Sequence, residues 1–281
     1  MAVAEKADLP WDLVVGMTLR RAAATLGPDA AGTSPWINTV GVYHRIRRRR
    51  GQQYCPACLL EHAVFYRSWR LSFVVVCRRH QLCLQDACPH CDVPLAIHRQ
   101  QLSADLCHAC SLPLSRKADV RLPTESLALA QSRWEHALAD DAMVGRVTIP
   151  ARALFQGVRV LVNLIKPLGS TGPQARSSAL ELSCVKERAQ MLLHLERLIE
   201  HWPEGFGAAA RQHHLTQRSF VRWSLPDWLA AEVDQLPKGH ARTGATHRGP
   251  LSLRAQLEAS RRQTGDWRTA RAELLWRAAT T

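Results

Sequence analysis

The chain has 281 residues, enough for one large domain or two to three small ones. Hydrophobic residues make up 46% and charged residues 22%, an ordinary globular composition that excludes disorder along the whole chain. With 37 Lys and Arg against 24 Asp and Glu, the formal net charge is +13, and this excess favours nucleic acid or another polyanion as a partner.

The sequence contains no run of about twenty apolar residues, and its start, MAVAEKADLPWDL, lacks the charged-then-apolar order of a signal peptide. We therefore expect a cytoplasmic protein with no membrane partner. Its nine cysteines are poor candidates for disulfides in a reducing compartment, so their grouping points to metal instead.

The first expected element is a helix over residues 8–26, whose apolar positions share one face before Gly27-Pro28 ends it. A polar stretch then leads to four consecutive arginines, Arg47, Arg48, Arg49 and Arg50. These are expected either to contact phosphates, with an affinity that is blind to sequence and falls with salt, or to remain a solvated charge run. We place an N-terminal helical segment with a basic run at residues 1–50.

Eight of the nine cysteines lie between positions 55 and 110, and seven of them form four ligand pairs together with one histidine. The pairs are Cys55 and Cys58, Cys77 and His80, Cys88 and Cys91, and Cys107 and Cys110. A Cys-x-x-Cys turn directs both thiolates at one ion, and a tetrahedral zinc ion needs two such pairs. The pattern therefore predicts two zinc ions per chain. Because four protein ligands leave no position for water, both are expected to be structural.

Sequential pairing gives one site from the first two pairs and another from the last two, with eighteen and fifteen residues between the halves. A crossed arrangement, first pair with third and second with fourth, also satisfies the spacing. The echo between CPHCDVPL at 88–95 and CHACSLPL at 107–114 favours the sequential order, because matching flanks suggest two similar turns facing one ion. Cys83 is left over and is expected to be a small buried hydrophobe or a spare thiol. With both ions bound the chain would still be basic, at about +10.

Further residues accompany the cysteines in a specific order: Tyr54-Cys55-Pro56-x-Cys58-Leu59, Glu61, Tyr66-Arg67-x-Trp69-Arg70-Leu71, a strand at 74–76, Cys77-x-x-His80 and Cys88-Pro89-x-Cys91. In this order residues 50–114 resemble the TniQ/TnsD family, the target-selection proteins of cut-and-paste transposons. Residues 1–54 lack the Gly-Glu-Ser-Leu-like start that the family usually has. We place a tandem zinc-binding, TniQ-like module at residues 51–118.

Downstream, helical periodicity predicts helices over 124–139, 151–166 and 176–202. In the last of these, Cys184 is expected to be packed and His194 to satisfy a local hydrogen bond. Two more helices are expected to meet near His214-Leu215, with Thr216 as the N-cap of the second.

That spacing permits a helix-turn-helix, whose second helix would present Arg218, Ser219 and Arg222 to a major groove. A plain basic amphipathic helix is the alternative interpretation. We place this helical domain at residues 119–237.

Residues 238–281 contain nine Lys and Arg against three acidic residues. We predict a basic C-terminal tail there, with a terminal helix over 251–279 that binds DNA, docks on a partner or packs on the protein. As a whole, the sequence predicts a mainly α-helical protein with a small β-containing tandem two-zinc module.

The resemblance implies a non-enzymatic adaptor for transposition target-site selection. Such a bacterial protein recognises target DNA, or a guide-RNA effector complex on DNA, and recruits the transposon's AAA+ ATPase regulator; it would be nucleoid-associated when on DNA. A second copy of the chain is a further candidate partner. Nucleic-acid or partner contacts are expected from ten arginines: Arg47, Arg48, Arg49, Arg50, Arg67, Arg70, Arg78, Arg79, Arg218 and Arg222.

Two other classes of function compete with the adaptor. One is a zinc-containing, sequence-specific DNA-binding regulator unrelated to transposition, which would bind its own site tightly in isolation. The other is an enzyme such as a nuclease. The sequence opposes an enzyme, because it shows no acidic constellation for two-metal chemistry, no phosphate-binding loop and no nucleophile paired with a base.

Overall fold

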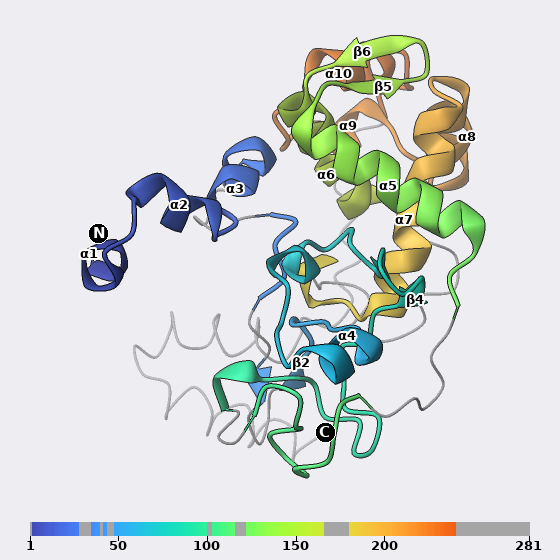
Figure 1. The fold of residues 1–281 in the computed structure, drawn as a ribbon. Coiled ribbons are helices and arrows are strands. Elements are labelled where there is room, and N and C mark those ends of the chain that lie inside the picture. Colours follow the sequence, from blue (N-terminus) through green and yellow to red (C-terminus); the bar gives the residue numbers. More distant parts are fainter. Residues whose placement is uncertain are drawn as a thin grey trace, which may run out of the picture. The chain divides into compact units, whose positions relative to one another are not determined.

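The computed structural model describes residues 2–27, 35–39, 42–43, 48–99, 103–115, 122–165 and 180–239. The chain divides into two compact units, Met1–Lys238 and Gly239–Thr281, so the predicted basic tail lies almost wholly outside the described residues. The first unit is mainly α-helical with short antiparallel hairpins, which confirms the predicted fold class (Figure 1). In the described part of the chain, no helix is long and apolar enough to cross a membrane.

Short helices replace the single helix that was predicted over residues 8–26. They are α1 Ala2–Ala7, α2 Trp11–Gly16 and α3 Arg20–Leu26. Pro10 is the N-cap of α2, and its missing amide cannot continue a helix from α1. Between α2 and α3, the Thr18 hydroxyl donates to the Val15 carbonyl and accepts from the Arg20 amide. The prediction of one continuous helix was therefore wrong: Pro10 delays its start to Trp11, and the Thr18 side chain bonds the backbone where α2 ends and α3 begins.

The region between α3 and the long helices consists of short elements. They are β1 Val42–Tyr43, β2 Arg48–Arg49, α4 Pro56–Glu61, the 3-10 helix η1 Arg67–Arg70, β3 Val76–Cys77, β4 Leu82–Cys83 and the 3-10 helix η2 Ile97–Arg99. β1 pairs with β2 and β3 with β4, both antiparallel. The leftover Cys83 lies in β4 opposite Val76 and is partly buried.

The helical part follows the predicted order. Its elements are α5 Glu125–Ala139, β5 Ala142–Val144, β6 Val147–Ile149, α6 Ala151–Leu164, the 3-10 helix η3 Leu180–Leu182, α7 Val185–Glu200, α8 Glu204–Gln212, α9 Gln217–Phe220 and α10 Asp227–Val233. α7 begins later than residue 176, because Cys184 is its N-cap and the Cys184 amide donates to the Glu187 carboxylate.

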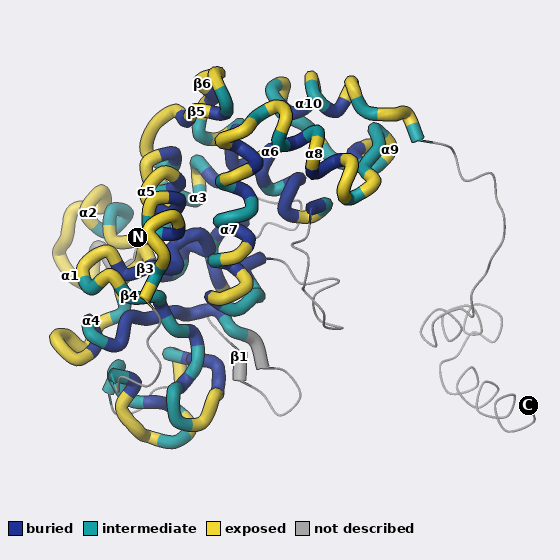
Figure 2. The backbone as a smooth tube through the Cα atoms, turned by 90° about the vertical axis from the view of Figure 1, so that its right-hand side faces the viewer, coloured by how far each residue is buried: buried dark blue, intermediate teal, exposed yellow. Residues whose placement is uncertain are grey.

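One hydrophobic core runs through the first unit, as the dark blue of Figure 2 shows. At its centre lie the rings of Trp36, Phe73, Trp134 and Phe155, with centroids 5.5 to 6.4 Å apart. Trp36 comes from the N-terminal segment, and Phe73 comes from residues 50–114, which we call the zinc region. Trp134 lies in α5 and Phe155 in α6. The expected boundaries near residues 50 and 118 therefore separate segments that share one core.

A buried amide joins α5 to the strand that leads into the first metal site. Gln131 of α5 is 2% exposed. Its Oε1 accepts from the amides of Val75 and Val76, both at 2.7 Å, and its Nε2 donates to the Val76 carbonyl. Gln131 thus satisfies backbone groups that would otherwise be buried without a partner.

A buried carboxylate joins the zinc region to α7. Asp86 accepts from the amide of Val185, the first residue of α7, at 2.7 Å and from Nη1 of Arg50 at 2.6 Å. The guanidinium of Arg188, 1% exposed, lies 3.7 Å from the same carboxylate. Burial lowers the pKa of Arg188 to about 10, while the nearby Asp86 opposes that shift. Two cations and one amide therefore compensate a charge that is costly to bury alone.

Replacing Asp86 with Ala is expected to lower the free energy of unfolding by about 3–5 kcal/mol, because Arg188 then stays buried without its counter-charge. Urea unfolding followed by circular dichroism measures the loss. Asp92→Asn is the matched control: Asp92 also pairs with Arg50, at 3.3 Å, but its side chain is 86% exposed, and asparagine tolerates the positive φ of this position, so removal of the charge should change little. Equal losses from the two variants would contradict the assigned role of Asp86.

Candidate metal centres

Three of the four ligand pairs are built on the same tight turn, which we call a knuckle. In each knuckle the amide four residues after the first ligand donates to that ligand's carbonyl, at 2.8 to 3.0 Å. The donor has a positive φ of 50° to 52° in two knuckles and 58° in the third, which turns the chain back on itself. The three donors are Gln81, Asp92 and Ser111. Both ligands of each pair are thereby directed to one side.

The repeated sequences at 88–95 and 107–114 form two matching knuckles. In both, the amide of the third residue donates to the first cysteine's sulfur at 3.4 Å, and the proline pairs with the residue before that cysteine. The leucines that follow, Leu95 and Leu114, are fully buried and donate to the carbonyls of Asp86 and Asp105. The repeat therefore begins at these aspartates, two residues earlier than the echo noticed in the sequence.

The remaining pair, Cys55 and Cys58, lies at the start of a helix. Cys55 is the N-cap of α4, and Pro56 takes the first helical position, where no amide partner is needed. The preceding Tyr54 forms a bridge with Gln85, and its hydroxyl donates to the Ala87 carbonyl at 3.0 Å. This contact ties the first ligand pair to the segment that enters the third.

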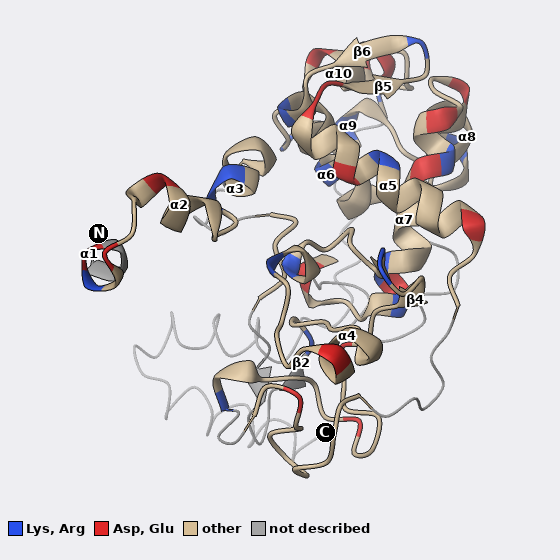
Figure 3. Cartoon of the chain, in the orientation of Figure 1, with Lys and Arg blue, Asp and Glu red and all other residues tan. Residues whose placement is uncertain are grey.

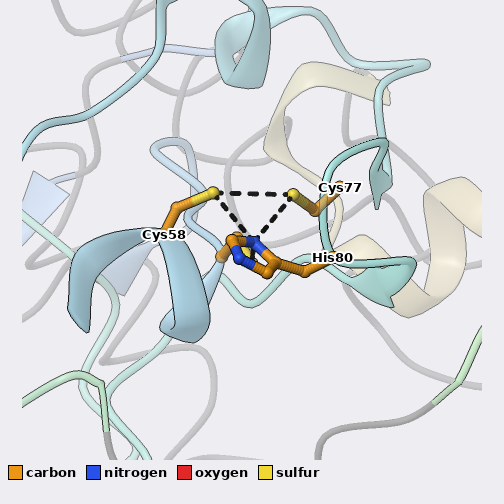
Figure 4. Close-up of side chains that lie close together, drawn as sticks. Cys58, Cys77 and His80 are labelled. Atoms are coloured by element: carbon orange, nitrogen blue, oxygen red, sulfur yellow. Dashed lines mark hydrogen bonds between the residues drawn. The ribbon is translucent and has the colours of Figure 1, made fainter. Parts of the chain in front are cut away.

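Site 1 is the set Cys55, Cys58, Cys77 and His80. Figure 4 shows Cys58, Cys77 and His80 pointing at one another. Nδ1 of His80 lies 3.6, 3.2 and 3.7 Å from the sulfurs of Cys55, Cys58 and Cys77, and the last two sulfurs are 3.6 Å apart. A tetrahedron with metal–sulfur bonds of about 2.3 Å has edges of about 3.8 Å, whereas a disulfide bond is about 2.0 Å long. The spacing suits four ligands around one ion.

Site 2 is the set Cys88, Cys91, Cys107 and Cys110. The sulfurs of Cys88 and Cys110 are 3.7 Å apart, as are those of Cys91 and Cys107. In each site all four ligand atoms lie within 4.8 Å of one another. The structure therefore brings together the sequential sets and not the crossed ones, and each set can hold a metal ion.

The pKa values of the thiols in both sites are shifted in opposite directions. Burial raises the pKa of Cys58 to about 11 and that of Cys88 to about 12. A hydrogen bond from Cys55 lowers the pKa of Cys77 to about 4, and the Leu112 amide lowers the pKa of Cys110. A divalent ion would stabilise the thiolates present and displace the protons of the other thiols. Three thiolates with one imidazole, as in site 1, and four thiolates, as in site 2, are both donor sets of structural zinc.

A carboxylate orients the one histidine ligand. Nε2 of His80 lies 3.0 Å from Oε1 of Glu61, and donation there leaves Nδ1 as the nitrogen that faces the sulfurs. The hydrogen bond to Glu61 raises the pKa of His80 and lowers that of Glu61. Arg79 pairs with the other Glu61 oxygen at 3.0 Å.

The arginines predicted to contact nucleic acid divide into two groups. Those in the zinc region engage the protein itself: Arg50 pairs with Asp86, Arg67 donates to the Thr18 carbonyl, Arg70 to the Asn38 carbonyl, Arg78 pairs with Glu135 and Arg79 with Glu61. Blue and red residues accordingly lie together around β4 in Figure 3. Arg218 and Arg222 are exposed and have no ion pair among the described residues. Arg48 and Arg49 form β2, and Arg47 lies outside the described residues.

The expected helix-turn-helix lacks its recognition helix. Thr216 is the N-cap of α9 as predicted, but α9 has only four residues. The Ser219 hydroxyl accepts from the Thr216 amide, so this side chain is engaged in the cap. A helix of one turn cannot present a row of side chains along a major groove. Arg218 and Arg222 are exposed as expected, but α9 is too short to place them against base edges.

The family model described as TniQ matches residues 2–84. This confirms the TniQ assignment for that part of the chain. The match includes α1–α3 and all of site 1, and it ends before Cys88. The match thus begins at residue 2, whereas the resemblance in the sequence was placed at residues 50–114. It ends at residue 84 and so does not include site 2. Neither the curated proteins nor the solved structures gave a match.

Protein purified without chelator is expected to contain two zinc ions per chain. Cys107→Ser should lower this to one, because site 2 loses a ligand, whereas Cys83→Ser should leave both ions in place, because Cys83 lies outside both ligand sets. Elemental analysis by mass spectrometry measures the content. Equal loss from the two variants would overturn the ligand assignment.

Replacing Glu61 with Gln is expected to weaken zinc binding at site 1 by about 10- to 100-fold, because the carboxylate that orients His80 is lost. Competition with a chromophoric chelator gives the affinities of the two sites. Glu125→Gln, which changes an exposed carboxylate in the first turn of α5, is the control. An unchanged affinity of site 1 would show that Glu61 does not orient the ligand.

Proposed function

We propose that this chain, whose residues 2–84 form a TniQ domain, is an adaptor that selects target sites in transposition. It recognises target DNA, or a guide-RNA effector complex bound to DNA, and recruits the AAA+ ATPase regulator of its transposon. The observation that carries the proposal is the coincidence of the TniQ match with a complete set of four converging ligands, Cys55 to His80.

In this proposal each site holds one structural zinc ion. Both sites have four protein ligands, which leave no position open for water or substrate. The ions would hold the ligand pairs in place. Asp86 and Tyr54, which lie just before two of these pairs, would thereby be held in contact with α7 and with the segment between the sites. Zinc thus acts on function by fixing the surfaces of an adaptor that carries out no catalysis itself.

The surface proposed for the ATPase regulator is formed by the exposed apolar side chains in and next to α2. Trp11, Leu13 and Met17 are 45%, 53% and 64% exposed, and α2 has no buried residue. Exposed apolar side chains that gather on one short segment are typical of a protein interface. Because this segment lies within the TniQ match, a protein contact there accords with an adaptor.

The ten arginines are not expected to contribute equally to the affinity for nucleic acid. The arginines of the zinc region would have to leave acidic or carbonyl partners before they could bind a phosphate, which reduces the net gain. Arg218 and Arg222 would give up no ion pair among the described residues. We therefore assign them the larger share of the contact with DNA or a guide-RNA complex.

The zinc-loaded chain is expected to bind the ATPase regulator of its transposon in a pull-down and to direct insertions to the selected target. Trp11→Ser combined with Met17→Ser should weaken this binding at least about tenfold, because large apolar side chains dominate interfaces. Val221→Ser is the control, since Val221 is 80% exposed but lies after α9. Insertion that is unaffected when the chain is left out would refute the adaptor role, and tight binding to a single DNA site without any ATPase contact would favour a separate regulator.

A further inference from the structure

Basic residues gather between positions 204 and 238, near the C-terminal end of the described sequence and outside the TniQ match. Between Glu204 and Asp227 the sequence has three arginines and two histidines and no acidic residue. Arg211, Arg218 and Arg222 are all exposed, as is Lys238 farther along the chain. We call these four residues the basic corner.

The backbone brings the arginines of α9 onto one side. Arg218 and Arg222 are four residues apart, and Val221 between them keeps helical angles of φ −51° and ψ −30°. Side chains at this spacing are neighbours on a helical surface, about 5–6 Å apart at Cβ. Two positive charges so placed repel each other unless an anion lies between them or nearby.

Two hydrogen bonds bring the other members to the same region. The Leu215 amide donates to the Ala210 carbonyl at 2.8 Å, which folds the end of α8, with Arg211, against the turn before α9. The Gln217 amide donates to the Pro237 carbonyl at 3.0 Å, so Lys238 follows directly beside the start of α9. The corner is therefore a tertiary surface assembled from three segments.

The corner is also unpaired, which distinguishes it from the arginines of the zinc region. None of its four cations has an ion pair among the described residues, although the Asp234 backbone is near, since its carbonyl accepts from Gln217. Arg222 lies over the ring of Trp223, with 5.5 Å between the guanidinium carbon and the ring centroid. This cation–π contact helps to position the guanidinium while leaving its N–H groups free to donate.

From these observations we propose that the basic corner binds the phosphodiester backbone of duplex DNA and reads no bases. Guanidinium groups match phosphate oxygens in a two-point hydrogen bond, and four exposed cations carried on segments joined by these backbone contacts favour a polyanion over a single ion. The one-turn α9 gives no helix to enter a groove. The inference deepens the proposed function, and it rests on that function only for the choice of DNA among polyanions.

The test is the salt dependence of DNA binding by the full zinc-loaded chain. Arg211→Gln, Arg218→Gln and Arg222→Gln are combined, and fluorescence anisotropy with two labelled duplexes of unrelated sequence gives the affinity over a range of salt concentrations. Each lost phosphate contact should reduce the slope of log K against log salt by about 0.9, so a reduction of about 2–3 is expected, equal for both duplexes. Arg222→Gln alone should reduce it by about 1.

The control removes the same charge elsewhere. Arg146, Arg152 and Lys186 are exposed, have no ion pair in the described part of the chain, and lie in the β5–β6 turn, α6 and α7. Their combined replacement by Gln should change the slope little, and two bound zinc ions should confirm that both triple variants are folded. An equal reduction in both triple variants, or a loss confined to one duplex, would overturn the proposal. So would a corner variant that loses affinity for polyglutamate but not for DNA.

Failure of this inference is distinct from failure of the adaptor role. The corner variant should still bind the ATPase regulator, because its changes lie outside α1–α3. Unchanged DNA binding together with normal recruitment would reject the corner alone. Lost recruitment by the unaltered chain would reject the adaptor and leave the DNA surface standing.

Discussion

The carboxylate of Asp86 is the contact on which the arrangement of this protein depends. It lies two residues before the first ligand of site 2 and accepts from the first amide of α7, from Arg50 and, more distantly, from Arg188. A buried carboxylate is tolerated only when it is paired, so the zinc region, the end of the arginine run and α7 must come together for any of them to be stable there. The position of α7 and the position of site 2 are consequences of the same ionic contact.

The metal sites and the core support each other through the backbone. Knuckles with residues at positive φ are strained and contribute little apolar surface, so they need an external constraint to persist. A zinc ion held by the four ligands would supply it from one side, and the protein supplies it from the other. Buried Leu95 and Leu114 anchor the two repeated knuckles, while Gln131 of α5 caps the strand that leads into Cys77. This division explains why the repeat carries a Pro-Leu after each pair of cysteines.

The charge of the protein has two different uses. Around the metal sites, arginines neutralise carboxylates or donate to carbonyls, and they hold the fold together. In the basic corner, four exposed cations have no ion pair among the described residues and are available to a partner. A net charge of +13 is therefore a poor guide to where a polyanion binds, because part of it is already used within the protein.

What the sequence determined by itself was local. The ligand spacing identified both metal sites, helical periodicity placed α5 and α6, and Thr216 marked the start of α9, because each depends on residues a few positions apart. Pro10 was a visible signal for the later start of the N-terminal helix and Thr18 for its break, and the aspartates that begin the repeat were visible two residues before each cysteine pair. Only the tertiary structure decided which arginines are engaged, because Asp86 meets Val185 across 99 positions and Arg78 meets Glu135 across the zinc region and α5. It also decided that α9 is one turn long and that Lys238 lies beside it, since the contact of Gln217 with Pro237 is made by packing that no periodicity encodes.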